Sequence, residues 1–89
     1  MGHMIRDKAK LLKRVRRIRG QIELVERLLE TEADCGATLQ QIAAARGAMN
    51  GLMSEVLEEH VRAHLLGGSA AARAEAADEL VGVVRTYLK

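Results

Sequence analysis

The side chains best suited to holding a metal ion or attacking an electrophile are one thiol and three imidazoles. They are His3, Cys35, His60 and His64. His60 and His64 lie four positions apart, which places both imidazoles on one face of a helix, where they can share a metal ion. Thiolate and imidazole donors suit Zn(II), Co(II), Ni(II) or Cu(II) better than Mg(II) or Ca(II). These residue types and this spacing indicate a transition-metal site.

Each of these groups also has a simpler interpretation. Glu58, Glu59 and Arg62 surround the histidine pair, so a solvated and idle pair fits the sequence as well. Cys35 fits either a small buried hydrophobe at a helix start or a thiol that the helix N-terminus favours as the reactive thiolate.

A second candidate surface is strongly basic. Residues 6 to 19 contain eight lysines and arginines and one acid, Asp7. The positions most consistent with one helix face and its margin are Arg6, Lys10, Lys13, Arg14, Arg16 and Arg17. The alternative is a helix face that is merely solvated. The excess of basic over acidic side chains favours a surface that binds a polyanion. No aromatic side chain lies between these basic residues, so the segment has nothing to stack on the bases of a single strand. Double-stranded DNA bound through its phosphates is therefore the best-fitting partner.

Composition and periodicity predict an all-α fold in which long helices carry these groups. The 89 residues are 48% hydrophobic, almost all aliphatic, with no Pro, Phe or Trp and one Tyr. Apolar spacing predicts helices over roughly 5–30, 36–66 and 71–88, joined by turns at 31–34 and 67–69, in one domain spanning 1–89. The sequence shows no signal peptide and no membrane-spanning segment, and its lone cysteine excludes an internal disulfide; we expect a cytoplasmic protein.

Two long helices and a short one cannot cover one another's apolar faces, so we expect a second chain to complete an antiparallel four-helix bundle. The candidate metal donors lead to the same expectation. Cys35 and His60 are 25 positions apart on one helix, or about 38 Å at 1.5 Å per residue. They meet only if two second helices pack antiparallel, which brings Cys35 towards His60 and His64 of the partner subunit. Four such ligands would also satisfy tetrahedral Zn(II).

The segments 14–21 (RVRRIRGQ) and 39–53 (LQQIAAARGAMNGLM), together with Cys35 and His60, resemble the CsoR/RcnR/FrmR family of bacterial repressors. The resemblance covers nearly the whole chain. It implies an all-helical dimer that pairs into a tetramer, a dimer of dimers without a helix-turn-helix. It also implies binding to operator DNA that an inducer at the cysteine site releases.

The subfamily depends on four positions. His3, Cys35, His60 and His64 match the His, Cys, His, His set of the nickel/cobalt sensors. The copper and persulfide sensors of the family need a second thiol, and this chain has His64 at the position of that second cysteine. The resemblance therefore excludes both of these sensor types. The resemblance therefore implies a repressor released by Ni(II) or Co(II), with Zn(II) also acceptable to the donors.

Two alternatives remain at the level of sequence. One is a formaldehyde-responsive repressor of the same family, using Cys35 and the N-terminal amine. The other is a helical scaffold whose histidines bind stray Zn(II). We do not expect an enzyme, because no nucleophile, acid and base are assembled.

Overall fold

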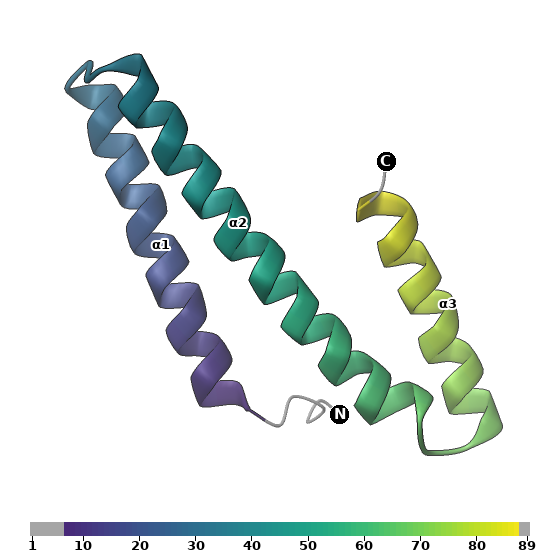
Figure 1. Ribbon diagram of the computed structural model, residues 1–89. Coiled ribbons are helices and arrows are strands. Elements are labelled where there is room, and N and C mark those ends of the chain that lie inside the picture. Colours follow the sequence, from purple (N-terminus) through teal and green to yellow (C-terminus); the bar gives the residue numbers. More distant parts are fainter. Residues whose placement is uncertain (1–6, 88–89) are drawn as a thin grey trace. The chain divides into compact units, whose positions relative to one another are not determined.

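The computed structural model describes residues 7–87, which form three helices and no strand (Figure 1). In chain order the elements are α1 (Lys8–Glu30), α2 (Cys35–His60), the π-helical turn η1 (Val61–Leu65) and α3 (Ala70–Tyr87). The all-α expectation is confirmed. The expected first residue of the first helix, Ile5, and the expected last residue of the third, Leu88, lie outside the described residues.

The helix expected over roughly 36–66 is present, but its type changes before its end. The α-helical hydrogen bonding of α2 stops at His60, and the next five residues are wound as a π-helix. π-Helical turns are rare and are frequently found at functional sites. Here the turn carries His64, one of the two histidines at i, i+4 spacing.

The chain divides into two compact units, and the first, Asp7–Glu55, is a helical hairpin. Figure 1 shows α1 and α2 of this unit running antiparallel from a tight turn. The turn is a Schellman motif: Ala33 N–H donates to the Leu28 carbonyl at 2.9 Å and Glu32 N–H to that of Leu29 at 3.2 Å. Glu32 takes the left-handed position with φ of 52°, where glycine is usual.

The hairpin buries only part of its apolar surface. Leu11 and Ile18 of α1 and Ala45 of α2 are buried between the helices. A second set of apolar side chains recurs every seven residues and stays open: Val15, Ile22 and Leu29 on α1, and Ile42 and Met49 on α2. Ile22 and Met49 are 53% and 52% exposed, respectively. Seven-residue spacing is the pattern of a helix that packs against further helices, so this open set predicts packing against a second chain.

The second unit contains the end of α2 from Val56, the turn η1 and α3. Gly68 makes the connection with a φ of +80°, a value that a side chain would strain. Ser69 caps α3, because its Oγ accepts the Ala72 N–H at 3.1 Å. Ala76, one turn further on, is buried. The turn and the cap thereby hold the first half of α3 against the segment that carries His60 and His64.

Within residues 7–87, none of the helices is long and apolar enough to cross a membrane.

We predict that the protein is a tetramer in solution and that Ile22→Asn weakens its assembly. The substitution removes an open apolar side chain at the predicted contact between chains without adding charge. Glu23→Asn is the matched control, because it introduces the same residue at the neighbouring, exposed position. Sedimentation velocity should show a tetramer for wild type and control, and smaller species for Ile22→Asn. A stable, folded wild-type monomer at micromolar concentration would contradict the packing argument.

Candidate functional site

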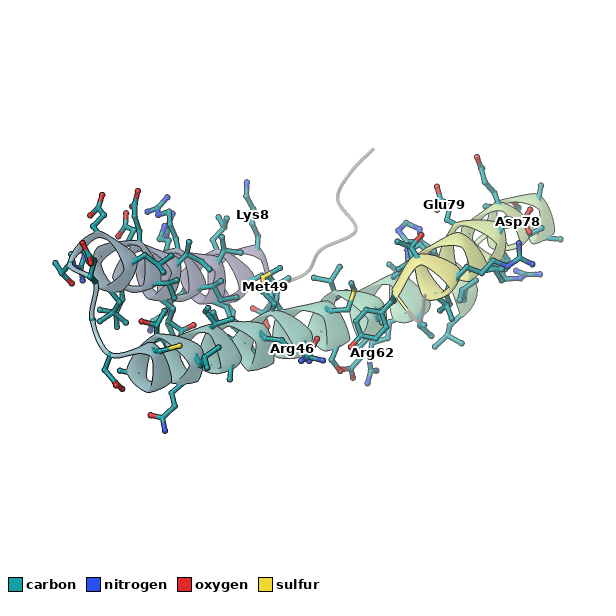
Figure 2. The ribbon with its side chains drawn as sticks, turned by 90° about the horizontal axis from the view of Figure 1, so that it is seen from above. Lys8, Arg46, Met49, Arg62, Asp78 and Glu79 are labelled. Carbon is teal, nitrogen blue, oxygen red and sulfur yellow. The ribbon has the colours of Figure 1, made fainter. Side chains whose placement is uncertain are left out.

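The basic side chains of α1 lie on the hairpin unit and are mostly exposed. Lys10, Lys13, Arg16 and Arg17 all face solvent. Figure 2 shows Lys8, at the start of the same helix, pointing away from α2. Arg6 lies outside the described residues. The helix therefore presents a continuous cationic surface to any large anion that approaches it.

Arg14 differs from its basic neighbours, because it lies between the buried positions Leu11 and Ile18 on the side of α1 that faces α2. Its guanidinium donates from Nη1 to Oε1 of Glu55 on α2, and this pair is an ion pair. Lys10 Nζ lies 3.5 Å from the other carboxylate oxygen of Glu55. One carboxylate from α2 is thus shared by two cations of the basic helix. Residue spacing alone does not distinguish Glu55 from the other glutamates, because its pairing depends on how the hairpin aligns its helices.

The two histidines lie side by side in the second unit. Their ring centroids are 5.0 Å apart and their planes are tilted by 50°. His60 Nε2 lies 3.1 Å from the carbonyl oxygen of Ala76 on α3. A carbonyl can only accept, so Nε2 carries the proton and Nδ1 keeps its lone pair. A free Nδ1 lone pair is what a metal ligand needs, and a hydrogen bond from the other ring nitrogen is how proteins orient such ligands.

The histidine pair lines a cavity of about 430 Å³ between the end of α2 and α3. Glu59, Glu75 and Glu79 contribute acidic groups to the same cavity, and Val56, Ala72 and Ala76 contribute apolar surface. Glu79 projects from α3 in Figure 2. Both histidines are partly buried, which argues against a merely solvated pair.

Glu75 and Glu79 were missed by the sequence analysis. The available signal was their own i, i+4 spacing on α3, which repeats that of the histidines on the segment opposite. Outside the cavity, a 2.8 Å hydrogen bond from Arg62 Nη2 to Glu58 raises the pKa of the Arg62 guanidinium further above its usual range, and the charge of Glu58 adds to the effect.

Cys35 is the first residue of α2 and is exposed in the single chain. The alternative of a small buried hydrophobe is therefore wrong for the isolated chain. The preceding residue, Asp34, caps the helix: its side chain accepts the Ala37 N–H at 3.0 Å, and its carbonyl accepts the Thr38 hydroxyl at 3.2 Å. The thiol is thus placed at a well-fixed helix start and open to a reagent or a second chain.

The thiol and the imidazoles do not come together within one chain. Cys35 begins α2 and His60 ends it, so the helix itself separates them. Among residues 7–87, no three His, Cys, Asp or Glu side chains are grouped closely enough to hold a metal ion. His3, the remaining candidate ligand, lies outside the described residues. A site that combines the thiol with the imidazoles therefore requires donors from another subunit.

A model of metal-sensitive transcriptional repressors matches residues 7–86. The chain belongs to this family. The CsoR/RcnR/FrmR resemblance is thereby confirmed, and the family is one of transcriptional regulators rather than enzymes.

The repressor family also supplies close relatives of full length. The chain is 54% identical over 91 residues to an uncharacterized protein in the bioA 5′ region of Serratia marcescens, with all of both chains covered. It is 44% identical over 90 residues to the transcriptional repressor RcnR of Salmonella arizonae, again over all of both chains.

A solved structure extends the comparison to the fold. This structure is a variant of the formaldehyde-responsive regulator FrmR from Salmonella enterica serovar Typhimurium, with a glutamate replaced by histidine. It superposes with a TM-score of 0.88 at 50% identity, over 97% of this chain and 99% of that one. The relatives therefore include both a protein named RcnR and a formaldehyde-responsive regulator.

We predict that neutral His60 is the Nε2–H tautomer, because Ala76 offers only an acceptor. Long-range ¹H–¹⁵N correlation spectra, recorded at a pH where the ring is neutral, should show Nε2 protonated and Nδ1 bare. The variants His64→Gln and His3→Gln would together assign the three histidine rings while keeping the His60 hydrogen bond. A dominant Nδ1–H tautomer at His60 would contradict the hydrogen bond to α3.

Proposed function

We propose that the protein is a transcriptional repressor that binds double-stranded operator DNA and is released when Ni(II) or Co(II) binds between its subunits. The proposed ligands are His3 and Cys35 of one chain with His60 and His64 of the partner subunit, in a homotetramer built as a dimer of dimers. We propose that the protein acts in the cytoplasm, because its proposed partner is operator DNA.

The observation that carries the metal proposal is the paired arrangement of His60 and His64. Two rings 5.0 Å apart, one with its Nε2 engaged by Ala76, are suited to offer nitrogen lone pairs to one ion. The exposed Cys35 at the far end of α2 supplies the soft donor once a second α2 packs antiparallel. A thiolate with imidazoles matches Ni(II), Co(II) and Zn(II). Backbone groups near His3 would extend the set towards the six donors that suit octahedral Ni(II) or Co(II) better than Zn(II).

The proposed DNA surface is the cationic face of α1. Its exposed side chains Lys10, Lys13, Arg16 and Arg17, with Arg14 and Arg6, have the charge to follow a phosphate backbone. His3 and Arg6 directly precede this helix in the chain. Drawing His3 onto a shared site would displace the start of the helix, which gives a physical route from inducer to DNA release. Coupling of a few kcal/mol is sufficient for such a switch.

A formaldehyde-responsive repressor is the second candidate. The exposed thiol of Cys35 supports it, because a thiol is the side chain most ready to add to an aldehyde carbonyl. The 50% identity to a formaldehyde-responsive regulator supports it too. In this version the N-terminal amine, rather than the histidines, is the second reacting group. His64 is therefore the residue that separates the two proposals.

We predict that Arg17→Ala and Arg14→Ala each weaken binding to duplex DNA and flatten its salt dependence. Each lost phosphate contact lowers the slope of log K against log salt by roughly 0.9. Arg85→Ala on α3 is the matched control, because it removes the same charge from another helix. Fluorescence anisotropy over a range of salt concentrations measures both quantities. If both α1 variants bind as wild type does, the DNA surface lies elsewhere.

We predict that Ni(II) and Co(II) release the DNA complex and that His64→Ala loses this response with DNA affinity intact. The loss should exceed the roughly tenfold cost of removing even an outer-shell partner of a metal site. Cys35→Ala should lose the response to metal and to formaldehyde alike. The measurement is a titration of the preformed DNA complex with each inducer. Release by formaldehyde alone, with His64→Ala behaving as wild type, would replace the metal proposal with the aldehyde one.

A further inference from the structure

Glu55 stands out as the acidic group that contacts the basic face of α1. One oxygen of its carboxylate accepts a hydrogen bond from Arg14 Nη1, and the other oxygen lies 3.5 Å from Lys10 Nζ. The Glu55 side chain is 27% exposed and that of Arg14 is 37% exposed, whereas Lys10 remains 64% exposed. Arg14 is therefore the cation that this contact draws furthest from solvent.

Gly51 leaves room for the Arg14 guanidinium beside Glu55 on α2. It lies one turn before Glu55, and a Cβ added there would collide with Arg14 Nη2 and lie 3.2 Å from its Cζ. Gly47, one further turn back on the same helix, has nothing within 4 Å of such a Cβ. The absent side chain at Gly51 leaves the space in which the guanidinium reaches the carboxylate.

A guanidinium offers its N–H donors to carboxylate and to phosphate in the same planar geometry. The donor that Glu55 holds is therefore withheld from a phosphate until the ion pair opens. Glu55 also cancels one positive charge within the face that attracts DNA.

We propose that Glu55 is an intramolecular competitor for DNA phosphate, which holds Arg14 and Lys10 on α2 in the DNA-free protein and lowers its affinity for DNA. The inference rests on the proposed use of the α1 face in DNA binding. Because Gly51 has no side chain, the Arg14 guanidinium can reach Glu55, and Glu55 can compete with DNA phosphate for it. The competitor limits how tightly the repressor binds any duplex, independently of sequence, because it acts on phosphate contacts alone.

The test is the affinity of Glu55→Gln for mixed-sequence duplex DNA at low salt, measured by fluorescence anisotropy. Glutamine keeps the shape of the side chain and removes its charge. Because partly exposed ion pairs are weak, we expect binding to tighten by about two- to fivefold, with the gain narrowing as salt rises. Thermal unfolding of both proteins checks that the fold is unchanged. Unchanged or weaker binding by Glu55→Gln overturns the proposal, since a residue that positions Arg14 for DNA would give that result.

Glu58→Gln is the matched control for charge. It raises the net charge by the same unit and also breaks an ion pair, that of Glu58 with Arg62. It should tighten binding less than Glu55→Gln does, and an equal effect would overturn the proposal in favour of net charge. In an Arg14→Ala background, Glu55→Gln should lose most of its effect, because the two residues act as one unit. A full effect without Arg14 would also overturn it.

The two glycines give a second, independent test. Gly51→Ala pushes the Arg14 guanidinium off its place and should tighten DNA binding, whereas Gly47→Ala should not. Weaker binding by Gly51→Ala would mean that Arg14 contacts DNA from its place on α2, which overturns the competitor role. The Arg17→Ala variant distinguishes an error in the competitor proposal from an error in the proposal that the α1 face binds DNA. If Arg17→Ala weakens binding while Glu55→Gln fails to tighten it, only the competitor is wrong.

Discussion

A helix cannot fold back on itself, and α2 therefore keeps Cys35 and His60 at its two ends. This separation governs the functional chemistry available to the chain. The thiol is the soft donor and the nucleophile, and the histidine pair holds the nitrogen donors. Neither group alone makes a complete transition-metal site, and residues 7–87 of one chain offer no cluster that does. The proposed inducer site is for this reason a property of an assembly.

The separation of Cys35 from His60 along α2 also accounts for the apolar side chains that the hairpin leaves exposed. Ile22 and Met49 are about half exposed, whereas Leu11, Ile18 and Ala45 of the same hairpin are buried. An antiparallel partner would cover that surface and would also carry each thiol to the far end of the opposite α2. One packing event thus serves stability and ligand binding together, and two-fold symmetry would build the site twice.

The sequence was sufficient for the helices and for the turn near residues 31–34, because each follows from the local spacing of apolar and polar residues. Features set by three-dimensional neighbours were not predictable. Glu55 is one of many glutamates until the hairpin aligns it with Arg14. The hydrogen bond from His60 to Ala76 depends on how α3 turns back after Gly68. Glu32 at a left-handed position runs against the preference for glycine there, so no propensity would have indicated it.

The π-helical turn η1 also changes the direction in which its own side chains face. A turn closed by i→i+5 bonds contains more residues than an α-helical one, so the side chains within it fall out of phase with those of α2 before it. One residue of offset corresponds to about 100° of rotation in an α-helix. A helical wheel drawn with α-helical spacing from α2 straight through Val61–Leu65 would thus misplace the side chains of this turn, His64 among them.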